Sequence, residues 1–368
     1  MMRARGRRPT SAALIAACLA TVALAAGCVV ENPPPPPPPP PPPALPAGLV
    51  IQPSSLAEDA QGNLWFTILG IPKVGRLDRS GSVSEFTLPP VTFGSNIVYG
   101  PDGNLWMVGI TTIGAAVAGN IIKTTPAGAS TYYDLPNTWV PEGLMVGPDS
   151  NLWFTAWAGA NPDGAVMIGR ITPPGALTVF PLPEPGTGAA TIASGPEHSL
   201  WLTESPVGRI GRVALDGKVV EYRLPRQNAL PGQIAAGSDG NVWFTENFSD
   251  RIARMTPKGM VTEFTVPVSG KYEAIVSGPD SNLWIAVNHS ASHPGSSANS
   301  TAGAILRMTT SGAATVFPIP SGAGVTGLIA RRDGTLWFSE RWVTGGPTYI
   351  GRITTAGEIT ETSLSLKQ

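Results

Sequence analysis

Asn241-Val242-Trp243-Phe244-Thr245-Glu246 is one copy of a motif that the chain repeats around seven tryptophans. The unit around it extends from Ile234 to Pro267 and contains two tight turns, Gly237-Ser238-Asp239-Gly240 and Pro257-Lys258-Gly259. Between the turns lie short runs of β-branched, aromatic and apolar residues. Such runs, bounded by Gly, Pro, Asn or Asp, are typical of strands and hairpin turns. The unit therefore predicts a small antiparallel sheet.

The seven tryptophans recur at spacings of 41, 47, 48, 42, 41 and 53 residues. Repeats of roughly 40–50 residues with four strands each are the signature of propeller blades. We therefore predict an all-β, seven-bladed β-propeller with four antiparallel strands per blade over residues 45–368. One blade cannot bury both of its faces alone, so we expect the tryptophans to pack between blades. They are Trp65, Trp106, Trp153, Trp201, Trp243, Trp284 and Trp337.

The composition agrees with a turn-rich β protein. The 368 residues include 43 Gly and 39 Pro, and only 13% are charged, against roughly 25% in an average domain. The formal net charge is −1, and it becomes −5 without residues 1–27, which contain four Arg and no acidic residue. Because no basic stripe remains, nucleic acid is not an expected partner. We expect a monomer.

Residues 1–27 have the features of an export signal, with arginines first and then an apolar run, Ala12 to Ala26, that is too short to span a bilayer comfortably. The run leads to Leu24-Ala25-Ala26-Gly27-Cys28, which resembles a bacterial lipoprotein cleavage box with Cys28 as the lipidated first residue. Ordinary signal cleavage near Ala26 and an uncleaved anchor are the alternatives. We expect an extracytoplasmic protein, lipid-anchored to the cell membrane or outer membrane of a bacterium.

A proline-rich linker, residues 28–44, follows and contains an unbroken proline run from Pro33 to Pro43. Polyproline II rises about 3.1 Å per residue, so this run predicts a stiff rod of roughly 34 Å. We interpret it as a spacer between anchor and propeller; a linker of no specific purpose and a ligand for a proline-binding partner are alternatives.

Two features of the repeats predict how the ring is built. The last blade has its own outer strand at residues 358–364, so we expect all four of its strands to come from the C-terminal end, with closure by packing between blades. The connection between the second and third strands varies most in length. Because antiparallel strands alternate in direction, these connections share one face with the links between blades, here called the variable-loop face. Loops on a rigid scaffold commonly hold the function.

Three tryptophans are followed, three residues later, by a glutamate: Glu204, Glu246 and Glu340. We expect these residues at the ends of second strands, near the central channel. Converging carboxylates there could hold a hard cation such as Mg²⁺. The alternative is structural, with each carboxylate accepting backbone N–H groups or pairing with an arginine.

Of the three histidines, His289 is the candidate general base, because it follows Trp284 by five residues in the longest loop and an imidazole titrates near about pH 6.5. A solvated loop residue is the alternative for His289. We interpret His293 as a loop residue and His198 as an exposed residue of a tight turn on the opposite face.

A basic residue recurs in every third strand. A single site would not need seven copies, so we predict a structural ring, with Glu85, Glu221, Glu263 and Glu361 of the outer strands as available partners. The ring consists of Arg76, Lys123, Arg170, Arg212, Arg254, Arg307 and Arg352.

The repeated unit resembles the virginiamycin B lyase (streptogramin lyase) family. The motifs are Asn151-Leu152-Trp153-Phe154-Thr155 with Ile168-Gly169-Arg170-Ile171-Thr172, and Trp337-Phe338-Ser339-Glu340 with Ile350-Gly351-Arg352-Ile353-Thr354. The resemblance extends from about Leu45 to Leu364. It implies a seven-bladed propeller that opens a cyclic depsipeptide antibiotic by Mg²⁺-assisted elimination, a carbon-oxygen lyase reaction with His as base and Glu on the metal. This chain departs from the pattern at Val287, which stands where a Glu would precede His289.

Two hypotheses follow. In the first, the protein is a lyase-like enzyme with His289 as base and Mg²⁺ on Glu246 or Glu204, with Glu340 as a further candidate ligand. In the second, it is a non-catalytic propeller that uses the loops of blades two, three, six and seven to hold a small or peptide-like ligand, a wall polymer or a protein.

Overall fold

The computed structural model describes residues 53–68, 71–88, 93–113, 116–136, 139–158, 166–183, 191–226, 229–247, 250–268, 270–288, 302–341 and 348–364. These residues all belong to the compact unit Pro42–Gln368. The predicted signal segment, Cys28, the proline-rich linker, His289 and His293 lie outside them. Within this described part, no helix is long and apolar enough to cross a membrane.

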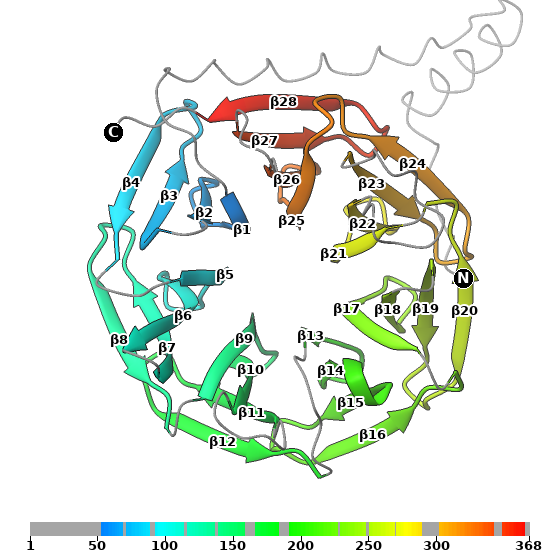
Figure 1. Cartoon of the computed structure of the whole chain (residues 1–368), viewed down its shortest axis with the longest axis horizontal. Helices are drawn as coiled ribbons and strands as arrows, with labels where there is room; N and C mark the ends of the chain where they lie inside the picture. The colour runs from blue at the N-terminus through cyan, green and yellow to red at the C-terminus, as the bar shows by residue number, and fades with distance from the viewer. Residues whose placement is uncertain are drawn as a thin grey trace, which may run out of the picture. The chain divides into compact units, whose positions relative to one another are not determined.

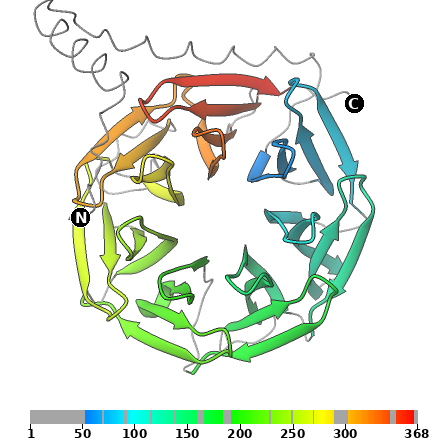
Figure 2. The ribbon, with the colours of Figure 1, turned by 180° about the vertical axis from the view of Figure 1, so that it is seen from behind.

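Seven four-stranded antiparallel sheets surround a central axis, which confirms the predicted seven-bladed propeller. Figures 1 and 2 show the ring from its two faces, with the first strand of each blade innermost and the fourth at the rim. Each blade takes four consecutive strands of the chain. Blade one is β1 (Pro53–Glu58), β2 (Leu64–Ile68), β3 (Lys73–Leu77) and β4 (Val83–Thr87); blade two is β5 (Phe93–Tyr99), β6 (Leu105–Ile113), β7 (Ala116–Thr124) and β8 (Ser130–Asp134); blade three is β9 (Trp139–Val146), β10 (Leu152–Ala158), β11 (Val166–Ile171) and β12 (Leu177–Pro181).

The remaining blades follow the same order. Blade four is β13 (Ile192–Ser194), β14 (Leu200–Glu204), β15 (Arg209–Val213) and β16 (Val219–Arg223), with the short 3₁₀ helix η1 (Ser205–Val207) before β15; blade five is β17 (Leu230–Ala236), β18 (Val242–Asn247), β19 (Arg251–Met255) and β20 (Val261–Thr265); blade six is β21 (Lys271–Ser277), β22 (Leu283–Asn288), β23 (Gly303–Met308) and β24 (Ala314–Pro318); blade seven is β25 (Gly324–Ala330), β26 (Leu336–Arg341), β27 (Thr348–Ile353) and β28 (Ile359–Leu364).

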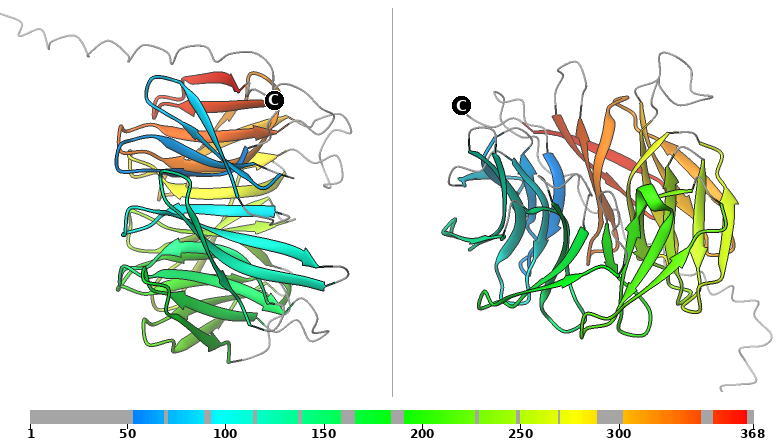
Figure 3. Two further views of the ribbon diagram at one scale, coloured as in Figure 1. Left: turned by 90° about the vertical axis from the view of Figure 1, so that its left-hand side faces the viewer. Right: turned by 60° about the horizontal axis from the view of Figure 1, so that its bottom comes forward.

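The tight turns of the repeat lie together on one side of the disc, as the edge-on view in Figure 3 shows. In blade five the turn is built on Asp239, whose carboxylate accepts hydrogen bonds from the Asn241 side chain (2.8 Å) and the Trp243 indole N–H (3.1 Å). The same aspartate-to-indole bond recurs in blades one, two, three and six. In these five blades the aspartate therefore ties the turn to the core, in addition to favouring the turn itself.

The tryptophans fill the spaces between blades, as predicted. Six of the seven are fully buried and Trp337 is 7% exposed. Trp243, for example, belongs to an apolar cluster that also takes Ile275 and Ile285 from blade six. Burying an aromatic side chain of this size contributes roughly 2–3 kcal/mol, and this contact is repeated from blade to blade around the ring.

The basic residue of the third strand is structural, as predicted, but its predicted carboxylate partners are wrong. Arg254 stacks on Trp243, with 5.6 Å between its guanidinium carbon and the ring centroid, and donates to the Thr310 carbonyl of the next blade at 3.2 Å. Glu263 pairs in register with Ala253, so it lies on the opposite face of the sheet from Arg254.

The outer-strand glutamates have other partners. Glu85 pairs with Lys73 and Glu221 with Arg209; Glu263 pairs with Arg251 and Arg226; Glu361 accepts from the Ser321 backbone.

Ring closure follows the prediction, because all four strands of blade seven come from the C-terminal end. The closing interface also contains a polar contact that the sequence did not predict. Arg331 of blade seven forms an ion pair with Glu58 of blade one (2.9 Å) and donates to the Gly62 carbonyl (2.6 Å). The Arg331 guanidinium also lies 4.9 Å from the Trp337 ring centroid. The Arg331 guanidinium thus joins blade seven to blade one through an ion pair and a hydrogen bond while it stacks on Trp337.

Candidate functional site

The central channel contains a cavity of about 330 Å³ to which every blade contributes. One position recurs in its lining, ten or eleven residues before the blade tryptophan. All seven side chains at this position are polar. They are Ser55, Asn96, Glu142, Thr191, Gln233, Glu273 and Thr326. We call this set the channel ring.

The channel ring exists because the innermost strands are irregular near their first residues. In blade five the register of β17 against β18 shifts between Pro231 and Ile234, which frees the intervening residues from the regular ladder. The Gln233 backbone N–H instead donates to the Thr245 hydroxyl at 2.9 Å. Equivalent register shifts occur in β1, β5, β9, β21 and β25. The bulge lies toward the variable-loop face, where each innermost strand begins.

The hydroxyl of the Trp-Phe-Thr motif therefore has a structural task. In blade four the Thr203 hydroxyl accepts from the Thr191 backbone N–H (3.3 Å) and donates to the Gly232 carbonyl of blade five (2.7 Å). In blade seven the Ser339 hydroxyl donates to the Ser54 carbonyl of blade one (2.7 Å). One buried hydroxyl thus supports the bulge of its own blade and joins it to the next blade.

The channel ring contains two carboxylates, in different electrostatic environments. Glu273 of blade six pairs with Lys271 (3.0 Å) and accepts from the Asn288 amide at 3.3 Å. Glu142 of blade three has no ion-pair partner among the described residues, and its side chain is exposed to the channel. Its position inside the channel partly desolvates the carboxyl, and this desolvation raises the pKa of Glu142.

The predicted metal ligands are elsewhere. Glu204, Glu246 and Glu340 are each 0–1% exposed and lie on the second strands of three different blades. None of them lines the channel cavity. The part of the chain that the structure describes contains no group of three or more His, Cys, Asp or Glu side chains that could hold a metal ion. These three glutamates are therefore not brought together.

In blades four and five the glutamate lies opposite an arginine. Glu204 pairs in register with Arg209, and the two side chains form an ion pair at 3.4 Å. Arg209 also donates to Glu221 of the outer strand at 3.0 Å. Glu246 lies opposite Arg251 in the same way. A buried carboxylate next to a guanidinium is the arrangement expected of a structural ion pair.

Blade seven has no such arginine in its described part. Glu340 accepts from the Ser321 hydroxyl at 2.8 Å, and the Ser321 backbone N–H donates to Glu361 at 3.0 Å. Burial, together with the neighbouring Glu361 carboxylate, raises the pKa of Glu340 to about 8. Two carboxyl groups held on one serine are most stable with a proton between them. At neutral pH Glu340 is therefore largely protonated, which is unfavourable for a magnesium ligand.

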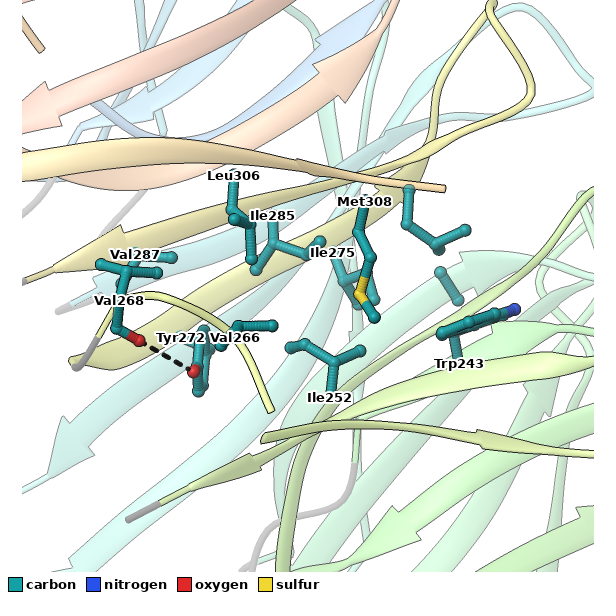
Figure 4. Close-up of a cluster of buried hydrophobic side chains, with 12 residues drawn as sticks. Trp243, Ile252, Val266, Val268, Tyr272, Ile275, Ile285, Val287, Leu306 and Met308 are labelled. Atoms are coloured by element: carbon teal, nitrogen blue, oxygen red, sulfur yellow. Dashed lines mark hydrogen bonds between the residues drawn. The ribbon is translucent and has the colours of Figure 1, made fainter. Parts of the chain in front are cut away.

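The corresponding position in blade six is apolar. Val287 is fully buried in the cluster between blades five and six, together with Tyr272 and Val268 (Figure 4). The Tyr272 hydroxyl donates to the Val268 carbonyl at 3.5 Å. Val287 is thus part of the core two residues before His289. His198 is exposed in its turn, as predicted.

Sequence reasoning missed the channel ring. The predicted site residues all follow a blade tryptophan, where the motif is most regular, whereas the channel ring lies ten or eleven residues before each tryptophan. Comparing the seven repeats would have shown a polar residue ten residues before the tryptophan in four blades and eleven residues before it in the other three.

Comparison with known proteins places these observations in a family. The profile of the virginiamycin B lyase family matches residues 46–165 and 141–368. A streptogramin B lyase structure is 29% identical, with a TM-score of 0.65, over 78% of this chain and 90% of that chain. A catalytically inactive histidine-to-alanine variant of virginiamycin B lyase from Staphylococcus aureus, solved with quinupristin, is 28% identical, with a TM-score of 0.67, over 79% of this chain and 92% of that chain. Among curated proteins, no match was found.

Proposed function

Because the chain belongs to the virginiamycin B lyase family, we propose that it binds a small or peptide-like ligand where the central channel opens onto the variable-loop face. The observation that supports this proposal is the channel cavity of about 330 Å³, lined by a polar residue from every blade. Cavities of roughly 300–1,000 Å³ with a few convergent polar groups are typical of small-molecule sites. The bulges place these groups near the face on which the variable loops begin.

The chemistry that we propose for a bound cyclic depsipeptide is elimination. His289 removes the proton from the carbon next to a carbonyl, the electrons of that C–H bond form a C=C bond, and the adjacent ester C–O bond breaks to release a carboxylate. The ring opens without addition of water. No step is assigned to Mg²⁺, because the described residues contain no group of three or more His, Cys, Asp or Glu side chains that could hold it. A magnesium requirement remains a prediction and is one variable of the experiment.

Product identity tests this proposal. The purified protein is incubated with a streptogramin B, with and without Mg²⁺. The products are separated by chromatography and their masses are measured by mass spectrometry. Elimination gives a linear isomer of unchanged mass with a new alkene, whereas hydrolysis adds one water. We expect turnover to be lost in His289→Ala and kept in the loop control His293→Ala. An intact ring, or turnover unaffected by His289→Ala, would refute the lyase chemistry.

A non-catalytic binding propeller is the second candidate. It is favoured by blade six, where Val287 is buried in the core at the position at which a glutamate would precede His289. In this case the antibiotic or another ligand is recovered unchanged after binding. Saturable binding without any isomer would identify this function.

We also propose export and lipid anchoring, on the basis of residues 1–27 and Cys28. In a bacterial host the wild-type protein is expected in the membrane fraction and to be extracted by detergent. Cys28→Ser is expected to leave the precursor uncleaved or to release a soluble protein, without the mass increase of acylation. Wild-type protein that is soluble and unacylated would exclude the anchor.

A further inference from the structure

The channel cavity has a one-sided charge. Its described lining contains two carboxylates and no lysine or arginine. The other polar members of the channel ring are hydroxyls and amides. A low-dielectric cavity with only negative charges repels anions and attracts cations. The lining therefore excludes a phosphate or carboxylate as the principal recognised group.

The two carboxylates are not equivalent for a ligand. Lys271 already neutralises Glu273, and Asn288 occupies a second acceptor position on the same carboxylate. Glu142 has neither kind of partner among the described residues, although it is exposed to the same cavity. An incoming cation consequently finds its free counter-charge at blade three and not at blade six.

Two other members of the channel ring, from blades five and one, suit a polar ligand. Within the described residues, no hydrogen bond involves the Gln233 amide group, which therefore has both a donor and an acceptor available. The Ser55 hydroxyl accepts from the Ile97 backbone N–H at 3.1 Å and still has its own proton to donate. Hydroxyl or amide groups of a ligand can bind at these positions while its charge binds at Glu142.

We propose that the channel selects ligands with a protonated amine, whose ammonium group binds the Glu142 carboxylate while its hydroxyl or amide groups bind Gln233 and Ser55. This inference rests on the proposed function, because it takes the channel as the ligand-binding space. An ammonium group has three N–H donors and no acceptor, and it matches one carboxylate with nearby amide and hydroxyl oxygens. Magnesium is the poorer match, because it requires near-octahedral coordination.

A matched pair of sugars tests the inference. Glucosamine and glucose differ by an ammonium group in place of one hydroxyl, and their binding to the full chain is measured by ligand-observed NMR or calorimetry near pH 7. We expect glucosamine to bind about tenfold more tightly than glucose, or better, because a charge-assisted hydrogen bond replaces a neutral one. Glu142→Gln is expected to remove this preference. The exposed Glu358→Gln lowers the net negative charge equally and is expected to keep it.

The outcomes are distinguishable. No preference for the amine, no binding of glucosamine at millimolar concentration, or a preference that survives Glu142→Gln would overturn the inference. Binding of Mg²⁺ alone that depends on Glu142 would also overturn it, since the site would then be a metal site. The streptogramin experiment depends on His289 and not on this preference. An intact antibiotic ring, or turnover unaffected by His289→Ala, therefore refutes the lyase chemistry alone, and absence of the amine preference refutes this inference alone.

Discussion

Glu340→Gln tests the electrostatics of the repeated glutamates most directly. In the folded protein the pKa of Glu340 is raised from 4.5 to about 8, because the side chain is buried beside Glu361. The folded state therefore binds a proton more tightly than the unfolded state. Stability from this group is complete below about pH 4.5 and is lost progressively as the pH rises to about 8. A glutamine is neutral at every pH and removes this dependence.

The magnitude follows from the shift. A pKa difference of about 3.5 units at about 1.36 kcal/mol per unit corresponds to about 5 kcal/mol. The glutamine amide can accept from Ser321 and donate to Glu361, so it reproduces the bonds of the protonated acid. We therefore expect Glu340→Gln to be nearly neutral at pH 5 and to stabilise the protein by several kcal/mol at pH 9.

The assay is urea unfolding of the wild type and the variant from pH 5 to pH 9, with the difference between the two proteins evaluated at each pH. This difference cancels the contributions of the other titrating groups. Glu204→Gln is the matched control, because it removes a charge at the same repeat position but leaves Arg209, which is 4% exposed, with only part of its counter-charge. It is expected to destabilise at every pH, by about 3–5 kcal/mol. A difference for Glu340→Gln that stays constant with pH, or destabilisation at pH 9, would refute the shared proton.

Two further predictions concern the scaffold. Arg331→Met is expected to lower the thermal midpoint strongly, with a loss of about 3–5 kcal/mol of stability, because it removes the ion-pair partner of Glu58 at the interface that closes the ring. The control Arg332→Met, at an exposed residue, should change stability little. Equal effects of the two variants would contradict the role of Arg331 in ring closure. Ser150→Gly is expected to stabilise the protein by about 0.5–1 kcal/mol, because Ser150 has a positive φ of 59°, and the equivalent turn residue in blade two is Gly103, with φ 75°. The reverse change, Gly103→Ser, should destabilise. Thermal unfolding measures both, and a loss of stability in Ser150→Gly would show that the serine hydroxyl outweighs the backbone strain.

Much of the fold could be predicted because it depends on local chemistry repeated many times. The Asp239-Gly240 turn, the apolar runs and the spacing of the tryptophans each act within one blade and predict strands and turns. The partners of Arg254 could not be predicted in this way. They depend on strand register, which places Glu263 opposite Ala253 and on the other face of the sheet. A register difference of one residue decides which side chains meet.

The candidate site was harder to predict for a related reason. The sequence places Glu204, Glu246 and Glu340 at one repeat position, and symmetry suggests one role. The structure gives them different surroundings, because the role of each depends on the residue across the ladder or in the linker that precedes the blade. Arg209 neutralises Glu204, whereas burial and the neighbouring Glu361 keep a proton on Glu340. Arg209 follows Glu204 by only five residues, but Ser321 and Glu361 are far from Glu340 in sequence.

The channel-ring side chains are less constrained by packing and charge balance than the glutamates of the second strands. A residue at the second-strand position is buried between blades, so replacing it must preserve packing and charge balance with a neighbouring blade. A channel-ring side chain such as Glu142 projects into a cavity, and the bulge that holds it is fixed by backbone bonds, for example from the Gly143 N–H to the Thr155 hydroxyl at 3.1 Å. Its identity can therefore change without cost to the scaffold. It follows that differences in ligand among propellers of this kind should be sought in the seven channel positions and the loops above them, and not in the tryptophan motif.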